Sequence, residues 1–594
     1  MSFSVSSVRN PLSTEAKTGI SITTMASNGG NIDSSSLSLQ VSTPIPISSA
    51  VTSSENTTEV SSKTNFRITF PIPIEMDANW KFEITFPSDI PIISFAEVNG
   101  YGVFGGKVNF LPNTTVNLVN NTVVVTNAAS TYTTTGLDAI VEFITITNPL
   151  STKITNSFQI FLKTSLDINI ASVTTGVTYT ASVGTITNMS AVPDATEVGV
   201  STSVLFKFMP THIIPVSSRL IITLPSETSI VAKDTASCFL SDLTQIQLTA
   251  TCSVNGRQIT IFNPFATDFI QDGTKIITFK INGITMPGTT APSTAGTFQT
   301  CSVQAGTCYD IDKSTQTALL TSTFGTLTSF NVAPLSKIAY DITKYTFTLI
   351  PAHDIPLGGK ILITLPPELT IPNPTFSGNS CSVIRRLNEG RNLLAIGLES
   401  SFIWLCTSST ILVDEGFVLS SFSAGGTITF DIQGIRNPVS LEATSSFQIK
   451  TQTLGSFVID QITTGRFVIM TSVSPLQSVS LASTSLINGA SNNVTFTVNS
   501  PSDLINGNIL SITFPSQMAL PTTLVWVGIT NLAPSLTCSN TGQKVDISLI
   551  FSADIILLAG NSISVTVQNI TNPTTTSPSD DFILLIKNVN GKIF

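Results

Sequence analysis

The cysteines are the residues of this sequence with the most evident chemistry. Six of the seven form three local pairs, which are Cys238 with Cys252, Cys301 with Cys308, and Cys381 with Cys406. Local pairs in a chain with few charges predict disulfides that form in an oxidising compartment, with buried free thiols as the alternative. Cys538 is left over, and we expect a buried thiol there in preference to a link between chains. No Cys-x-x-Cys occurs, so no zinc site is expected.

Histidine chemistry is scarce. The chain has two histidines, His212 and His353, which stand 141 residues apart. One metal ion would need both in a single coordination sphere, so we expect each to be an ordinary residue of a surface loop. A serine nucleophile would also need one of these two histidines as its base, and no Gly-x-Ser-x-Gly motif is present.

Two acidic pairs, Asp310/Asp312 and Asp580/Asp581, could ligate Ca²⁺ between domains. Neither lies in a dense cluster of oxygen ligands with suitable spacing, so we do not expect a calcium site. No Gly-x-x-x-x-Gly-Lys-Ser/Thr loop is present to hold a phosphate. The sequence therefore predicts no catalytic residue, no metal and no cofactor, and we expect that the protein is not an enzyme.

Asparagine offers a site for covalent modification. Asn-x-Ser/Thr sequons occur at Asn56, Asn113, Asn120, Asn188, Asn493 and Asn569. Because Ser and Thr are abundant, several of these would arise by chance, and unmodified asparagine is the alternative. Asn113 and Asn120 flank an expected turn and should be accessible, whereas Asn569 should be partly buried. In a secretory compartment, glycans at these positions would keep a weakly charged surface soluble.

These residues are carried by a tandem repeat, the first feature to look for in a long chain. The motif Ile-Thr-Phe/Leu-Pro ends at Pro87, Pro225, Pro366 and Pro515, which are 138, 141 and 149 residues apart. An alternating apolar and polar run precedes each copy, as in Phe66-Arg67-Ile68-Thr69-Phe70. Strict alternation is typical of a half-buried strand.

A second motif marks the end of each repeat. It contains Asn-Pro at Asn10, Asn148, Asn437 and Asn572, whereas the second full repeat has Met286 in the asparagine position. A further strand follows each marker, as in Phe158-Gln159-Ile160. The two motifs share one period and predict four β-sandwich repeats, at 37–174, 175–316, 317–464 and 465–594.

Residues 1–36 are predicted to be the C-terminal strands of an incomplete repeat. A half-sandwich exposes strand edges and an apolar face, so other strands must complete it. Preceding chain of a longer array is the interpretation that we favour. A neighbouring subunit that exchanges strands is the alternative, and both imply head-to-tail continuity.

Short strands, frequent turns and no useful helical periodicity predict an all-β fold. We expect tandem Ig-like antiparallel β-sandwich domains in an elongated array, although the Cys…Trp…Cys signature of true immunoglobulin domains is absent. The third repeat also carries a charged insertion, Arg385-Arg386-Leu387-Asn388-Glu389-Gly390-Arg391. We expect a solvated loop there, with a binding site as the alternative.

Composition excludes several classes of protein. Of 594 residues, 11% are charged, with 27 Lys and Arg against 36 Asp and Glu. So few basic residues argue against a nucleic-acid partner. No apolar stretch is long enough for a membrane span in this segment. Disorder is not expected, because 41% of the residues are hydrophobic.

The repeat motifs resemble those of very large cell-surface proteins of ciliates and similar protists. The third repeat shows this best, with Phe447-Gln448-Ile449-Lys450-Thr451 followed by Gly455 and by Ile459-Asp460. The resemblance implies an extracellular or cell-surface location and brings no catalytic residues. Met286 departs from the pattern, so the marker asparagine cannot be a universal functional group.

The sequence thus predicts an extracellular structural glycoprotein, a segment or subunit of a rod or filament that assembles with itself. Its partners would be head-to-tail copies or neighbouring repeats of a longer chain, together with covalent glycans. The alternative is a cell-surface adhesin stalk with a glycan- or protein-binding site on a loop.

Overall fold

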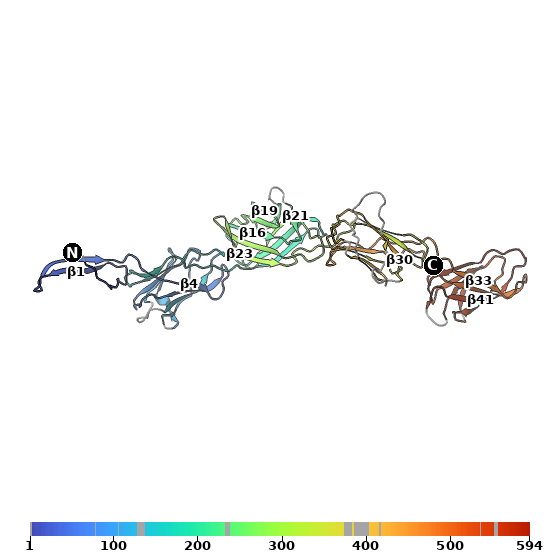
Figure 1. Cartoon of the computed structure of the whole chain (residues 1–594), viewed down its shortest axis with the longest axis horizontal. Coiled ribbons are helices and arrows are strands. Elements are labelled where there is room, and N and C mark those ends of the chain that lie inside the picture. Colours follow the sequence, from blue (N-terminus) through green and yellow to red (C-terminus); the bar gives the residue numbers. More distant parts are fainter. Residues whose placement is uncertain are drawn as a thin grey trace. The chain divides into compact units, whose positions relative to one another are not determined.

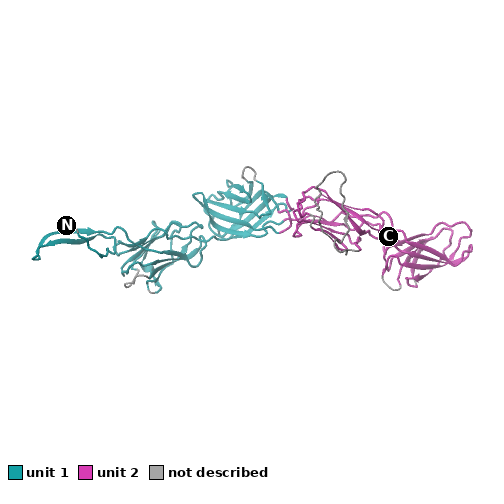
Figure 2. Cartoon of the chain, in the orientation of Figure 1, with its two compact units in different colours: residues 1–196, 200–286, 292–321 teal, residues 197–199, 287–291, 322–594 magenta. Residues whose placement is uncertain are grey.

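The computed structural model describes residues 3–77, 79–104, 106–127, 137–231, 238–372, 383–384, 403–414, 417–534, 536–551 and 556–593. The chain divides into two compact units (Figure 2). Unit 1 comprises residues 1–196, 200–286 and 292–321, and unit 2 comprises residues 197–199, 287–291 and 322–594. Strands dominate both units (Figure 1), and one short 3-10 helix, η1 (Leu111–Asn113), stands among the described residues. No described helix has the length and apolar character to cross a bilayer.

Unit 1 begins with an isolated antiparallel hairpin, β1 (Lys17–Met25) and β2 (Asn31–Leu39). Strand β2 runs three residues past the predicted boundary at residue 36, because Leu37 and Leu39 continue its alternation. Almost every residue of the hairpin is exposed. These strands therefore have the length and pairing of a sandwich hairpin without a core against which to pack.

The first sandwich follows. One sheet has the order β3 (Ile45–Pro46), β13 (Asn169–Val173), β12 (Gln159–Lys163), β6 (Lys81–Thr85), β10 (Thr122–Val125), β9 (Thr114–Asn117). The other has the order β4 (Val51–Ser54), β5 (Lys63–Pro71), β11 (Asp138–Thr147), β7 (Glu97–Gly102), β8 (Val108–Asn109). These strands lie within the range predicted for repeat 1.

The second sandwich completes unit 1. Its first sheet has the order β14 (Ile186–Pro193), β15 (Ser201–Pro210), β21 (Ile277–Thr285), β17 (Ser229–Ile230), with β18 (Leu240–Thr244) also on β21. Its second has the order β19 (Thr251–Asn255), β20 (Gln258–Phe262), β16 (Ser218–Thr223), β22 (Gly296–Gln304), β23 (Thr307–Gln316). We call this sandwich repeat 2.

Unit 2 holds repeat 3 and repeat 4. The sheets of repeat 3 have the orders β24 (Ser329–Pro334), β25 (Ile342–Ile350), β30 (Ile428–Arg436), β27 (Val383–Ile384) and β28 (Ile403–Cys406), β29 (Thr410–Asp414), β26 (Lys360–Thr364), β31 (Gln448–Gln452), β32 (Val458–Ile462). Those of repeat 4 have the orders β33 (Ser478–Ser483), β34 (Ser491–Asn499), β41 (Ser562–Thr571), β37 (Val525–Thr530) and β38 (Thr537–Thr541), β39 (Lys544–Ser548), β36 (Ile509–Thr513), β42 (Ile583–Lys587), with a short pair β35 (Leu504–Ile505) and β40 (Ile556–Leu557). The predicted all-β fold of tandem antiparallel sandwiches is confirmed.

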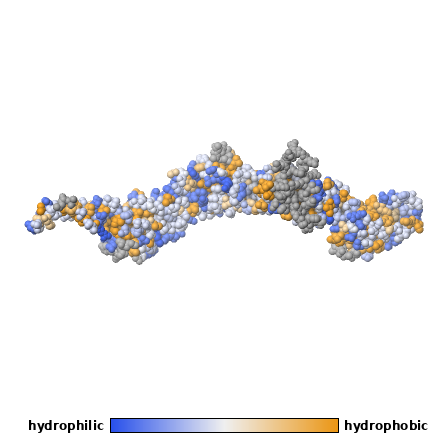
Figure 3. Space-filling model, in the orientation of Figure 1, coloured by the Kyte–Doolittle hydropathy of each residue, from blue (hydrophilic) through white to orange (hydrophobic). Residues whose placement is uncertain are grey.

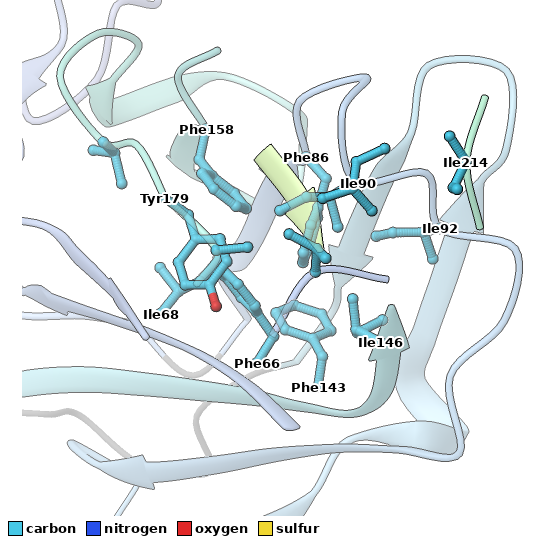
Figure 4. Close-up of a cluster of buried hydrophobic side chains, with 14 of the residues drawn as sticks. Phe66, Ile68, Phe86, Ile90, Ile92, Phe143, Ile146, Phe158, Tyr179 and Ile214 are labelled. Atoms are coloured by element: carbon cyan, nitrogen blue, oxygen red, sulfur yellow. The ribbon is translucent and has the colours of Figure 1, made fainter. Parts of the chain in front are cut away.

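The cores form where the alternating residues of two facing sheets meet. In β5, the burial alternates residue by residue, so that Phe66 is buried while Arg67 faces outward. Phe66 stacks on Phe158 with ring centroids 5.4 Å apart, and Phe86 meets Phe143 edge to face at 5.0 Å (Figure 4). Large apolar side chains also reach the surface in both units (Figure 3).

We expect Phe66→Ala to lower the free energy of unfolding of repeat 1 by about 3–5 kcal/mol, because the substitution opens a cavity in the core. Hydrogen exchange of the amides in β5 and β11 measures this repeat by itself. The control is Phe467→Ala, at a phenylalanine that is 53% exposed. Equal effects of the two substitutions would contradict this description of the core.

Candidate functional site at the junctions between repeats

Parallel strand pairing among the described residues occurs only at the linkers that join the sandwiches. In unit 1, Ser182 pairs with Glu59 of repeat 1, and Gly184 pairs with Asp312 of repeat 2. The N–H of Val60 donates to Ser182 O (3.0 Å), and the N–H of Gly184 donates to Ile311 O (2.8 Å). The linker is thus hydrogen-bonded to both neighbouring sandwiches within three consecutive residues.

Unit 2 repeats this arrangement. Thr323 pairs with Glu197, and Gly325 pairs with Asp460 of repeat 3. Further along the chain, Ser472 pairs with Ile338. The linkers at 182–184 and 323–325 therefore share one two-sided pattern of backbone bonds although their sequences differ, whereas the linker at Ser472 is paired only with repeat 3 among the described residues.

A second backbone contact also recurs, and it comes from the loop that follows three of the end markers. The N–H of Thr152 donates to Asp310 O (2.9 Å), and the N–H of Thr290 donates to Val458 O (3.0 Å). Thr14, four residues after Asn10, donates in the same way to Asn169 O (3.0 Å). The end marker of one repeat is in this way bonded to the last strand of the next.

The marker asparagine has a structural role that the sequence alone did not reveal. The side-chain amide of Asn437 donates to Ser336 O (3.0 Å) and Ile338 O (2.7 Å), and its Oδ1 accepts from the hydroxyl of Tyr345 (2.6 Å). Asn148 and Asn572 each make the corresponding pair of donations to their own loops. All three asparagines are buried, and in repeats 1 and 3 the loop carbonyls that they bind belong to the segment that pairs with the linker.

The marker proline contributes through its carbonyl. Ser61, Gly199, Tyr340 and Gly489 occupy one position of the repeat and all have a positive φ. Each donates its backbone N–H to the carbonyl of the marker proline, at Pro149, Pro287, Pro438 and Pro573 respectively. The same tight turn therefore forms in every repeat, including repeat 2, where Met286 replaces the asparagine.

Both histidines lie in loops, as expected, but each is also paired with a buried aspartate, which was not expected. His212 Nδ1–H donates to Asp312 Oδ1 (2.6 Å), and His353 Nδ1–H donates to Asp460 Oδ1 (2.7 Å). Both aspartate side chains are fully buried, whereas the histidine side chains are 11% and 26% exposed. Each histidine is thus paired with an aspartate about a hundred residues further along the same repeat, a separation that no local sequence pattern spans.

Each aspartate also binds the backbone of the histidine loop. Asp312 Oδ2 accepts from the N–H groups of Thr211 and His212, both at 3.0 Å. Asp460 Oδ2 accepts from Ala352 and His353 at the same distances. A buried carboxylate with several donors is well compensated for its loss of hydration. The pair therefore anchors the loop after β15 or β25 to the last strand of the same repeat.

The linker glycine lies directly against this pair. A Cβ on Gly184 would overlap Asp312 Oδ1 and the ring of His212, and one on Gly325 would overlap Asp460 Oδ1 and the ring of His353. Repeat 1 has apolar residues at both positions of the pair, Ile74 and Ala171. Ile45 occupies the linker position there, since it pairs with Ala171 as Gly184 pairs with Asp312. A glycine is therefore found at this linker position where the adjoining repeat has the histidine and the aspartate.

Ser62 of repeat 1 gives the first of these sites the outline of a serine triad. Its Oγ lies 3.2 Å from His212 Nε2, on the side of the ring opposite Asp312. The Glu59 carboxylate is also near, at 3.9 Å from the same nitrogen. The counterpart of Ser62 in repeat 2 is Val200, which has no hydroxyl, yet repeat 3 retains the pair of His353 and Asp460. What the two sites share is the anchoring of a loop.

Potential metal ligands do not cluster in the described part of the chain. No group of three or more His, Cys, Asp or Glu side chains there could hold a metal ion. Asp310 instead accepts from the side chain of Gln299, and Asp580 accepts from Ser516 and Gln517 at 3.0 Å. Both carboxylate oxygens of Asp312 already accept hydrogen bonds from the histidine loop.

Two disulfides lie among the described residues. They join Cys238 to Cys252 and Cys301 to Cys308, each with Cα atoms 5.5 Å apart. Cys381 lies outside the described residues, so its pairing with Cys406 stays a prediction. The charged insertion at 385–391 also lies outside them.

Cys538 is a free cysteine and is exposed, so the expected buried thiol is wrong. It lies on β38, an edge strand whose residues are all exposed. Partial desolvation nevertheless raises the pKa of its thiol, which lowers the thiolate fraction at neutral pH.

The sequon asparagines are mostly accessible. Asn56, Asn113, Asn120 and Asn188 are exposed. Asn569 is exposed as well, which corrects the expectation of partial burial, because a positive φ there turns the residue out of β41. Asn493 is half-buried, and its Oδ1 accepts from the N–H of Asn569 (3.2 Å). Whether any of them carries a glycan stays a prediction.

No family model and no curated protein matches the chain. Solved structures resemble it only weakly. The C-terminal domain of an antigen I/II-family protein of Streptococcus pyogenes is 11% identical and covers 51% of this chain and 99% of its own, with a TM-score of 0.18. The BSP domain of a biofilm associated protein is 10% identical and covers 91% and 99%, with a TM-score of 0.16. Likenesses with TM-scores this low carry no argument about this chain, and the resemblance to protist surface repeats stays a prediction.

We expect Asn437→Met, which copies the residue of repeat 2, to lower the free energy of unfolding of repeat 3 by about 2–4 kcal/mol, because two loop carbonyls and the Tyr345 hydroxyl lose their partner. Burial raises the pKa of Tyr345, so its hydroxyl stays a donor. Asn148→Met should cost less, since no hydrogen-bond partner of Asn148 Oδ1 exists among the described residues. Hydrogen exchange in each repeat makes the comparison, and Tyr345→Phe serves as the matched control. Equal costs at both asparagines would contradict the role given to Tyr345.

We expect Gly184→Ala to destabilise the histidine loop of repeat 2 by about 2–3 kcal/mol, because the new methyl group displaces the buried pair. The measurement is faster hydrogen exchange at the amides of Thr211 and His212. Gly106→Ala is the control, because a Cβ there meets open space and the backbone has no positive φ. Unchanged exchange at Thr211 in the Gly184 variant would exclude the packing described here.

Proposed function

We propose that this chain is a segment of an extracellular or cell-surface structural protein, a stalk or filament of tandem β-sandwiches with head-to-tail continuity. Its action is mechanical. Each junction would limit the rotation of one sandwich against the next, so that the array transmits force instead of coiling.

The observation that supports this proposal is the linker that is hydrogen-bonded on both sides. A flexible linker has several consecutive residues without hydrogen bonds to the domains that it joins, so these domains sample many relative orientations. Here Ser182 and Gly184 bind different sandwiches and are separated by a single residue. Thr152 adds a third backbone bond across the same junction. Few rotatable dihedrals are left to act as a hinge.

The extracellular location is supported by the two disulfides and by the low content of charged residues. Glycans on the exposed sequon asparagines would add solubility to a surface that has many apolar side chains. An adhesin stalk shares all of these features. Its binding loop would be the charged insertion at 385–391, and no observation on the described residues favours that alternative.

The test is negative-stain electron microscopy of the full chain with the angle between repeats 1 and 2 measured particle by particle. We expect a narrow distribution of angles in the natural sequence. Insertion of three residues of Gly-Ser-Gly between Ser182 and Val183 should widen it at least about twofold, because the linker then becomes a flexible chain.

The matched control inserts the same three residues between Leu118 and Val119, in an exposed turn of repeat 1. This variant should keep the narrow distribution. If the natural sequence is as broad as the linker variant, the mechanical proposal fails. Labelling of intact source cells with an antibody against the chain tests the location independently.

A further inference from the structure

The N-terminal hairpin has the same construction as the last hairpin of each repeat. Strand β1 pairs with β2 through Ile22–Ser35, Thr23–Ser34 and Thr24–Asp33, and β12 pairs with β13 through Ile160–Val173, Phe161–Ser172 and Leu162–Ala171. Every residue of the first set lies 138 positions before its counterpart in the second. Both ladders also have a register shift at the next pair. The hairpin is therefore a finished sandwich hairpin and not an irregular terminal segment.

One hydrogen bond assigns this hairpin to a particular kind of repeat. The N–H of Asp33 donates to Thr24 Oγ1 at 3.1 Å. The N–H of Asp312 donates to Thr300 Oγ1 at 3.1 Å, and the N–H of Asp460 donates to Thr451 Oγ1 at 3.0 Å. Repeat 1 has Leu162 and Ala171 at these positions. Asp33 therefore occupies the position of the aspartates that anchor a histidine loop.

Asp33 has no such loop to anchor within the described residues. Its side chain is exposed, and the apolar residues of the hairpin are exposed as well, namely Ile20, Ile22, Ile32, Leu37 and Leu39. Phe158, Ile160 and Ile170, the counterparts of the first three in repeat 1, are fully buried. The hairpin thus presents an apolar face, with a carboxylate at the position where repeats 2 and 3 bind a histidine and two backbone N–H groups.

We propose that the β1–β2 hairpin is the docking surface for a β-sandwich of this same class that lacks its last two strands and that presents a histidine loop to Asp33. This inference rests on the head-to-tail continuity in the proposed function and specifies the chemistry of the incoming sandwich. That sandwich supplies an apolar inner face, a histidine Nδ1–H and two consecutive backbone N–H groups.

A second copy of this chain does not fit this description. Repeat 4 already has a strand in the place of β1, namely β42, which pairs with β36 as β12 pairs with β6. Its loop has Pro501 and Ser502 where repeat 3 has Ala352 and His353. Proline has no N–H, and the N–H of Ser502 donates to Ser500 Oγ at 3.2 Å. Repeats 2 and 3 have the histidine, but their own hairpins occupy the position.

The test is a graft within the full chain. Residues 447–462 of repeat 3 are replaced by residues 20–35, which places Thr24 on the position of Thr451 and Asp33 on that of Asp460. We expect repeat 3 to fold, with the amides of Ala352 and His353 protected from hydrogen exchange as in the natural chain. Asp33→Asn within the graft should reduce that protection about tenfold or more, since the charged acceptor is lost.

The matched control grafts residues 158–173 of repeat 1, which have the same length but Leu162 and Ala171 at the two positions. That chain should form the core of repeat 3 and leave the two amides unprotected. The proposal is overturned if the 20–35 graft fails to fold while the 158–173 graft folds, or if both leave the amides equally exposed. Either outcome leaves the stiffness of the junction untouched, so it is distinguishable from failure of the proposed function.

Discussion

Backbone hydrogen bonds at Ser182 and Gly184 tie one short stretch of linker to two different sandwiches, and the other features of the junction serve these bonds. Asn148 holds the loop that receives Ser182. Asp312 and His212 fix the strand and loop beside Gly184, and the absence of a side chain on the glycine lets the linker approach that strand. Because backbone groups form the primary contact, the linker sequence can vary, provided that the residue beside a histidine–aspartate pair stays small.

The histidine–aspartate pairs follow one physical rule, which is that the donor and the acceptor are present together or absent together. Repeats 2 and 3 have a histidine with an aspartate, and repeat 1 has Ile74 with Ala171. Half of such a pair would leave a buried carboxylate uncompensated, which costs several kcal/mol. This explains why the two positions change together although they are far apart in the sequence.

Much of the fold could be predicted because the alternation of apolar and polar residues in a strand is visible within a few consecutive residues. The alternation in Phe66-Arg67-Ile68-Thr69-Phe70 and the repeated Ile-Thr-Phe/Leu-Pro motif predict strands and period without any knowledge of contacts. The junction could not be predicted in this way, because its contacts join residues about a hundred positions apart. One signal was available, since the aspartate in Ile311-Asp312 and Ile459-Asp460 is present in the repeats that contain a histidine. The exposure of Cys538 was missed because sequence alternation does not distinguish an edge strand from a central one.

Met286 makes repeat 2 differ from the other repeats in how its loop is held. Its repeat keeps the turn at Gly199 but has no side-chain amide to bind the loop carbonyls, so the loop relies on the backbone bond to Pro287. Both described disulfides lie in that same repeat, away from this loop. Under tension, such an array does not stretch uniformly. The loop beside Met286 would yield before its counterparts in the other repeats, so a strong pull would be absorbed first by a short lengthening at one place.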